Sequence, residues 1–215
     1  MSCAMTKVLI TGFSPFGGNE TNPSEKAVRA LPDIENAMIS KLYLPVVWSN
    51  AAQALEREIS VFSPDVVIMT GLAGGSDRIR IERVAINLRG ALRDNDGLYP
   101  DGSDIPCETE CVPCGDAAYF STFDFRNIYD AIKKAGLPVS YSFSAGTYLC
   151  NDILYHALYK NRKEERNMRA GFIHLPYEKS PQTDPRAFAM PLDDMVKALA
   201  AAVYASVNAD GVKKG

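Results

Sequence analysis

Apolar strand-like segments alternate with amphipathic helical segments along this 215-residue chain, and this alternation constrains the fold more than any other feature. The strand-like segments are residues 7–11, 37–44, 64–70, 78–88, 138–143 and 170–175, and the helical segments are residues 22–31, 48–61, 123–135, 150–160 and 192–207. Strands that are joined through helices form a largely parallel sheet with helices on both faces. We therefore expect an α/β fold, a single three-layer α/β/α domain over residues 1–215 with a mostly parallel twisted sheet and frayed ends at residues 1–6 and 208–215.

The segment around Cys150 passes from a strand pattern to a helix pattern within a few residues. Residues 138–143 alternate as a strand does, and Gly146 suits the tight turn before the helix. A thiol in or next to the first helical turn lies near unpaired N–H groups and the positive end of the helix dipole, which lower its pKa. This position suits a nucleophile that attacks a carbonyl group, although Cys150 can also be a small buried hydrophobic residue.

His174 is the better candidate base of the two histidines in the chain. His156 lies six residues beyond Cys150 on the same helix and points away from it, whereas His174 ends a strand, where α/β proteins bind ligands. Glu82 is in phase with the apolar residues of segment 78–88, and a carboxylate on an apolar face needs a partner. That partner is either an arginine at position 78, 80 or 83 or an imidazole that the carboxylate orients.

Two glycine-rich loops follow predicted strands at the same edge of the sheet. The first contains Phe13 and Phe16, which either fill a seam beneath the loop or line an apolar pocket for a flat ligand. Its glycines match neither of the common phosphate-binding motifs. The second loop, residues 71–76, follows the buried strand 64–70.

The polar segment 92–115 is long for a connection within a compact domain, and its length suggests a role in function or assembly. It contains Cys107, Cys111 and Cys114. Three close cysteines can bind a metal or form a redox pair, but structural zinc takes four ligands and no fourth ligand lies nearby. We therefore expect loop thiols and no metal site.

The overall composition excludes several classes of protein. The net charge of −3 gives no electrostatic basis for binding nucleic acid or an anionic membrane. No apolar run approaches the length of a membrane span, and the apolar run near the N-terminus is too short for a signal peptide. Five unevenly spread cysteines do not resemble a secreted disulfide framework, so we expect a cytoplasmic protein.

Six blocks of the sequence, in order along nearly the whole chain, resemble the type I pyroglutamyl peptidases (pyrrolidone carboxyl peptidases), a family of cysteine peptidases. The blocks are residues 11–18 with Asn22-Pro-Ser, 71–75, 81–87, 117–122, 145–151 and 171–176. The resemblance implies a cytoplasmic cysteine exopeptidase that needs no cofactor and hydrolyses the amide bond after an N-terminal pyroglutamyl residue through a thioester. It also implies a homo-oligomer, usually a tetramer and otherwise a dimer.

The resemblance also assigns roles to individual residues. It implies Cys150 as nucleophile, His174 as base and then acid, and Glu82 as the residue that orients the imidazole. For the substrate, it implies an aromatic-walled pocket with main-chain contacts to the lactam amide; its residues are Phe13, Phe16, Asn22, Leu72, Tyr148 and Leu149.

The chain departs from the family pattern around the expected pocket. Leu72, Ser76 and Asp152 stand where the family usually has Gln, Arg and often His, and Tyr148 stands where a pocket phenylalanine is usual. The segment after Asn87 is one residue shorter. Two alternatives to a pyroglutamyl peptidase therefore stay open: a related thiol amidase for another cyclic or acylated amine, and a catalytically inactive binding or assembly protein.

Overall fold

A central sheet of six strands organises the protein, whose structure is a computed structural model that describes residues 5–180, 186 and 188–208. In spatial order the strands are β2 (Ala37–Leu44), β1 (Thr6–Phe13), β3 (Val66–Leu72), β8 (Arg169–Leu175), β4 (Ile79–Glu82) and β7 (Val139–Ser142). The first four strands are parallel to one another, and β4 pairs antiparallel with β8 and parallel with β7. The predicted mostly parallel sheet is confirmed.

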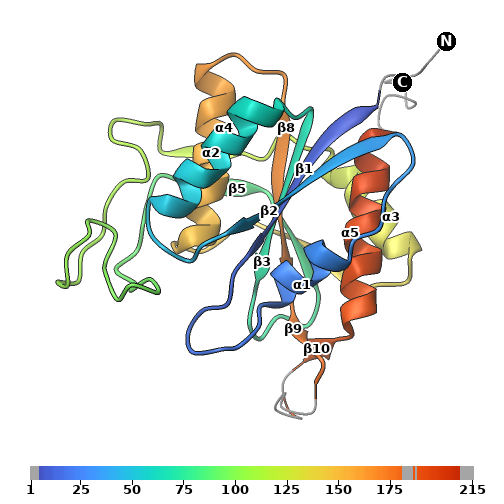
Figure 1. Cartoon of the computed structure of the whole chain (residues 1–215), viewed down its shortest axis with the longest axis horizontal. Coiled ribbons are helices and arrows are strands. Elements are labelled where there is room, and N and C mark those ends of the chain that lie inside the picture. Colours follow the sequence, from blue (N-terminus) through green and yellow to red (C-terminus); the bar gives the residue numbers. More distant parts are fainter. Residues whose placement is uncertain (1–4, 181–185, 187, 209–215) are drawn as a thin grey trace.

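Among the described residues, five helices cover the two faces of this sheet, as the ribbon in Figure 1 shows. One face packs against α1 (Pro23–Ala30), α3 (Phe125–Lys134) and α5 (Leu192–Val207), and the other against α2 (Asn50–Phe62) and α4 (Leu149–Lys163). The alternation of side chains along β1 divides its residues between the two cores: Val8 and Ile10 enter the first, and Leu9 the second. The predicted α/β/α layering is therefore confirmed.

The predicted strand over residues 78–88 is two strands rather than one, because the chain changes sheets at Arg83. Strand β4 ends at Glu82, and β5 (Val84–Ile86) pairs with β6 (Ala118–Phe120) in a separate two-stranded sheet. The backbone N–H of Arg83 still bonds to Ser142 O of β7, while its carbonyl accepts from the N–H of Ser121 next to β6. Periodicity does not reveal this change of partner, because the chain stays extended through it.

The remaining segments follow the predictions less closely. Phe13, expected in a loop, is the last residue of β1 and is buried. The chain after β8 also forms β9 (Tyr177–Glu178), which pairs with β10 (Ala189–Met190). Most of the expected frayed ends, residues 1–4 and 209–215, lies outside the described residues, and Thr6 already belongs to β1.

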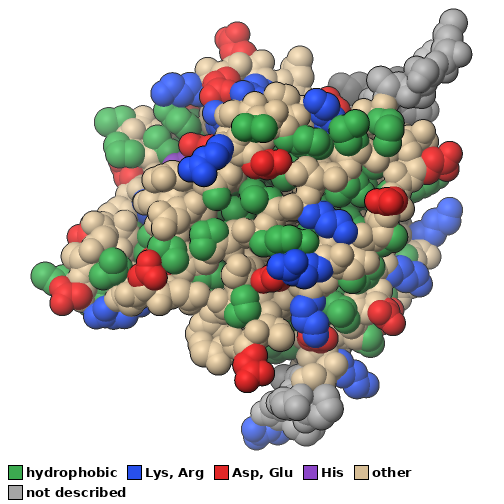
Figure 2. All heavy atoms as spheres, in the orientation of Figure 1, with side chains coloured by type: hydrophobic (Ala, Val, Ile, Leu, Met, Phe, Trp, Pro, Cys, Tyr) green, Lys and Arg blue, Asp and Glu red, His purple; other side chains and the backbone are tan. Residues whose placement is uncertain are grey.

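The surface carries both signs of charge. Lysine and arginine side chains are interspersed with aspartate and glutamate on the face shown in Figure 2. Within the described ranges, no helix has the length and apolar character that crossing a membrane requires.

Candidate active site

An apolar pocket of about 200 Å³ lies at the carboxyl ends of the central strands, beside the start of α4. Its lining comes from β1 and the loop after it, from the connection after β2, from the end of β3, from β8 and from the turn into α4. The residues that line it are Phe13, Phe16, Asn22, Val46, Leu72, Ala145, Tyr148, Leu149, Cys150 and His174. This edge of an α/β sheet is where such folds bind their ligands.

The thiol of Cys150 and the imidazole of His174 approach the same point of the sheet. Gly71 of β3 is the register partner of His174 on the adjacent strand β8. A Cβ atom built on Gly71 would lie only 2.9 Å from the sulfur of Cys150, so the sulfur lies directly over this glycine. The sequence thus brings a strand-end histidine and a helix-start cysteine together, with a glycine leaving room for the sulfur.

Glu82 completes a row of three functional groups. Its Oε1 lies 2.8 Å from Nδ1 of His174, and the carboxylate is fully buried. Because a carboxylate only accepts, Nδ1 carries a proton, and in the neutral ring Nε2 then has a lone pair that can accept a proton. Of the two partners that the sequence left open, the imidazole is the closer: Nε of Arg80 is 4.0 Å from the same oxygen.

Burial makes the thiol of Cys150 less acidic, whereas the sequence predicts that the helix start makes it more acidic. Removal from water, together with the negative charge of Glu82, raises the pKa of Cys150 to about 12, although its own backbone N–H acts to lower it. The predicted lowering of this pKa by the helix start is therefore wrong. The thiol is neutral near pH 7 and needs a base to remove its proton.

The predicted pocket residues Phe13, Phe16, Leu72, Tyr148 and Leu149 all contribute to the lining. Together with Val46 and Ala145 they form a wall that is mostly apolar. Such a wall suits a flat, uncharged ring better than a charged group.

Asn22 also lines the pocket, but its amide is already engaged within the protein. Its Nδ2 donates to Ser14 O at 3.1 Å, and its Oδ1 caps α1 by accepting from the N–H and the hydroxyl of Ser24. These bonds fix the loop that carries Phe16.

Sequence reasoning missed Gly71, Val46 and Ala145. A glycine near the carboxyl end of an otherwise apolar strand is a signal of close approach, and that signal could have found Gly71. Val46 and Ala145 lie in connections without periodicity, where the pattern gives no such signal.

The three cysteines of the long segment lie apart from this pocket. Cys111 is buried, Cys107 is half-buried and Cys114 is exposed. Burial and the nearby carboxylate of Asp152 raise the pKa of Cys111 to about 12. In the part of the chain that the structure describes, no three His, Cys, Asp or Glu side chains gather as metal ligands.

A thiol, an imidazole and a buried carboxylate beside an apolar pocket define a cysteine hydrolase on an α/β/α fold. Comparison with known proteins agrees: the family model described as pyroglutamyl peptidase matches residues 6–209. The chain belongs to the pyroglutamyl peptidase family, and the predicted family and enzyme class are confirmed.

Individual relatives extend this similarity over almost the whole chain. The chain is 42% identical over 208 residues to the pyrrolidone-carboxylate peptidase of Lactobacillus johnsonii, covering 95% of this chain and 94% of that one. A crystal structure of pyroglutamyl peptidase I from Bacillus amyloliquefaciens is 35% identical, with a TM-score of 0.85 over 94% of this chain and 97% of that one. The pyrrolidone carboxyl peptidase of Thermococcus litoralis is 33% identical, with a TM-score of 0.87 over 98% of this chain and all of that one (100%).

Proposed function

We propose that this protein is a cysteine exopeptidase that removes an N-terminal pyroglutamyl residue from peptides. The observation that carries the proposal is a small apolar pocket of about 200 Å³ with Cys150 and His174 in its wall. The pyroglutamyl ring is flat, uncharged and half apolar, so it suits this lining. A free N-terminus would bring an ammonium group that loses its water without gaining a partner.

In the first half of the reaction, Nε2 of His174 accepts the proton of Cys150 while the sulfur attacks the carbonyl carbon after the pyroglutamyl ring. The free N–H groups in the first turn of α4 then face the oxyanion that forms. When this tetrahedral intermediate collapses, the C–N bond breaks, and His174 gives its proton to the leaving amine. The shortened peptide leaves, and a thioester on Cys150 remains.

In the second half, His174 removes a proton from a water molecule that attacks the thioester carbonyl. The S–C bond breaks, free pyroglutamate leaves, and the proton returns to Cys150. Glu82 holds the imidazole in one tautomer through both halves and stabilises its charged form. Each proton that leaves one group thus arrives at another.

A panel of fluorogenic amides tests the proposal. We expect the wild-type protein to hydrolyse a pyroglutamyl amide but not the matching alanyl or prolyl amides, and to lose activity with iodoacetamide. Cys150→Ala should abolish turnover and leave the fold intact by circular dichroism, while Cys114→Ala, an exposed control, should keep activity. Hydrolysis by the Cys150→Ala variant, or equal hydrolysis of all amides, would contradict the proposal.

We also propose that the protein acts in the cytoplasm as a homo-oligomer, a tetramer or a dimer. Cys107, Cys111, Cys114 and Cys150 are free thiols, which suits a reducing compartment. Phe120 and Phe143 are each 70% exposed, and apolar side chains of this size are typical of surfaces that a partner covers. Light scattering after gel filtration measures the oligomer directly, and a monomer at micromolar concentration would contradict it.

A further inference from the structure

Residues 88–98, called the brace below, run along the outside of the active-site pocket. The brace overlaps the start of the long polar segment 92–115, whose role the proposed reaction does not explain. It forms hydrogen bonds with the Phe13–Phe16 turn, with the segment at residues 46–48, and with the turn before α4. Each of these three segments supplies residues to the pocket lining.

Asn95 connects the brace to one wall of the pocket. Its Nδ2 donates to Pro15 O at 2.9 Å, between the two phenylalanines of the turn. Its backbone N–H donates to Val46 O, also at 2.9 Å, and Val46 lines the pocket. One residue of the brace therefore holds two segments of the lining in place.

Tyr148 connects the brace to another part of the pocket lining, the turn before α4. Its hydroxyl donates to Arg93 O at 2.9 Å, and Gly90 N donates to Thr147 O at 2.7 Å. Burial and the carboxylate of Asp94 raise the pKa of Tyr148 to about 12, so the hydroxyl keeps its proton and stays a donor at neutral pH. The hydroxyl that distinguishes this residue from phenylalanine is thus engaged with the brace.

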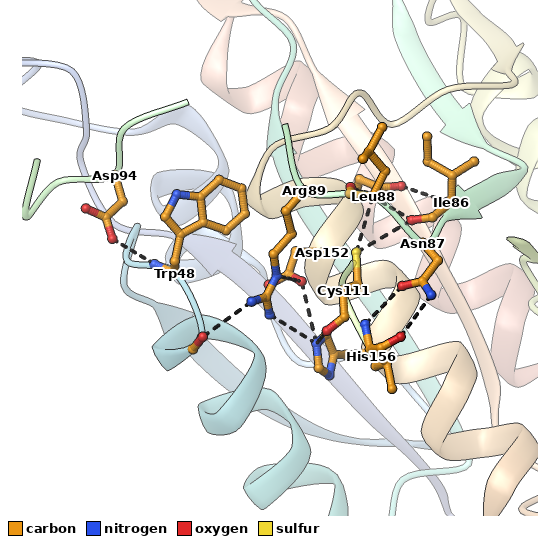
Figure 3. A network of polar contacts seen from close by, with 12 residues as sticks. Trp48, Ile86, Asn87, Leu88, Arg89, Asp94, Cys111, Asp152 and His156 are labelled. Atoms are coloured by element: carbon orange, nitrogen blue, oxygen red, sulfur yellow. Dashed lines mark hydrogen bonds and ion pairs between the residues drawn. The ribbon is translucent and has the colours of Figure 1, made fainter. Parts of the chain in front are cut away.

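The brace itself is fixed at two points, and Figure 3 shows the Asp94–Trp48 contact of the first and the Arg89–Asp152 contact of the second. At one point, the buried carboxylate of Asp94 accepts from the N–H of Trp48, and the indole N–H donates to Leu92 O. At the other, Arg89 forms a buried ion pair with Asp152 of α4, with Nε 2.7 Å from Oδ1. Asp152 lies two residues after Cys150, so the brace is fastened to the helix that carries the thiol.

We infer that the brace sets substrate affinity by holding two aromatic parts of the pocket lining, the Phe13–Phe16 turn and Tyr148, in fixed relative positions, with Asn95 and the hydroxyl of Tyr148 as positioning residues. The inference rests on the proposed function for its substrate. The walls contact the ring equally in the ground state and in the transition state. Loosening them therefore raises KM and leaves kcat nearly unchanged.

The test is a double-mutant cycle with Tyr148→Phe and Asn95→Ala, measured on a pyroglutamyl amide. We expect each variant to raise KM about three- to tenfold, as loss of one hydrogen bond does, with kcat within twofold of wild type. The double variant should raise KM by clearly less than the product of the two single effects, because both bonds act through one segment. Ser103→Ala, which removes a local bond in the same long segment, serves as control and should change neither constant.

Two results would overturn the inference. One is an unchanged KM in both single variants. The other is full additivity, which would mean that the hydroxyl of Tyr148 contacts the substrate directly instead of acting through Arg93 O. Thermal unfolding of each variant shows that the fold is retained.

A second readout separates this inference from the proposed function. Amide hydrogen exchange in residues 13–18 should become faster in Asn95→Ala and stay unchanged in Ser103→Ala, with no substrate present. If the wild-type protein does not cleave the pyroglutamyl amide, the proposed function fails while the exchange result still tests the brace. If the wild-type protein cleaves the amide and exchange is unchanged in Asn95→Ala, the inference about the brace is contradicted while the proposed function stands.

Discussion

The sulfur of Cys150 lies directly over Gly71, so close that a Cβ on this glycine would be 2.9 Å from the sulfur and 2.8 Å from the ring of Phe172. Both distances are shorter than a carbon atom can tolerate, and both neighbours are held by packing. The glycine is therefore a requirement of the site. It lets the thiol approach β3 at the point where His174 lies opposite on the neighbouring strand β8.

This contact predicts that Gly71→Ala displaces the thiol from the imidazole. We expect kcat on a pyroglutamyl amide to fall about tenfold or more, and the free energy of unfolding to fall by about 1–3 kcal/mol, as overpacking does. Steady-state kinetics and urea unfolding measure the two effects.

Gly136→Ala is the matched control for this substitution. Its backbone φ is +82°, and nothing lies within 4 Å of an added Cβ, so the variant loses stability through backbone strain alone. Its kcat should equal that of wild type. If Gly71→Ala also keeps full kcat, the close approach has no bearing on the reaction.

The raised pKa of Cys150 predicts how its reaction with iodoacetamide depends on pH. With a pKa of about 12, the reactive thiolate is a small fraction near pH 7 and increases as pH rises. We expect the alkylation rate at Cys150, followed by peptide mass spectrometry, to increase at least tenfold between pH 7 and pH 10. A thiolate already formed by the helix start would instead give a flat rate over this range.

Cys111 provides the internal comparison for the alkylation experiment. Its pKa is also raised to about 12 by burial, but it lies outside the pocket that contains the imidazole. It should react more slowly than Cys150 at every pH. Equal rates at the two cysteines would mean that the imidazole does not assist Cys150.

The position of Arg80 predicts a contribution from charge next to Glu82. Arg80 is the antiparallel register partner of His174, its Nε is 4.0 Å from Glu82 Oε1, and it donates to Ser142 Oγ at 3.1 Å. The other carboxylate oxygen, Oε2, is buried without a hydrogen-bond partner among the described residues. The positive charge of Arg80 thus partly balances the negative charge of the Glu82 carboxylate, one of whose oxygens has no hydrogen bond in the described part of the chain.

We therefore expect Arg80→Met to lower kcat about tenfold with KM within twofold, since the arginine side chain is partly exposed and its charge is partly screened. Arg80→Lys should restore most of the activity because it keeps the charge. Arg78→Met removes an exposed arginine that pairs with Asp77 and should have no effect. Full activity of Arg80→Met would show that Glu82 needs no cation.

Local sequence patterns predicted much of the fold. The strand over residues 37–44 and the helix over residues 192–207 have the predicted bounds, because each carries its own periodicity and a clear end. Glu82 could be singled out because a carboxylate in an apolar pattern demands a partner. The choice between imidazole and arginine needed the register of β4 against β8, which no local pattern contains.

The features that sequence did not predict are long-range ones. The change of sheet at Arg83 depends on Ser121, nearly forty residues away in the chain. The acidity of Cys150 depends on how completely the fold buries the thiol, and a motif does not report burial. The brace joins residues 15, 46, 93 and 148, whose proximity follows from the completed fold alone.

The ion pair between Arg89 and Asp152 supports a last prediction, on stability. The carboxylate of Asp152 is fully buried, and the guanidinium of Arg89 is nearly so. Nε2 of His156 lies 3.5 Å from Asp152 Oδ1, the oxygen that also pairs with Arg89. Removal of one partner leaves the other charge buried and unpaired. We expect Arg89→Met to lower the free energy of unfolding by about 3–5 kcal/mol in urea titrations.

The double variant Arg89→Met/Asp152→Leu should recover much of that loss, since it removes both charges and leaves apolar groups of similar size. Arg166→Met breaks a partly exposed pair with Glu164 and should cost less than about 1 kcal/mol. If the double variant is less stable than Arg89→Met, the pair contributes through the wider network with His156 rather than through its own two charges. In that case Asp152→Leu alone should be as unstable as the double variant, because both lose the carboxylate that faces His156.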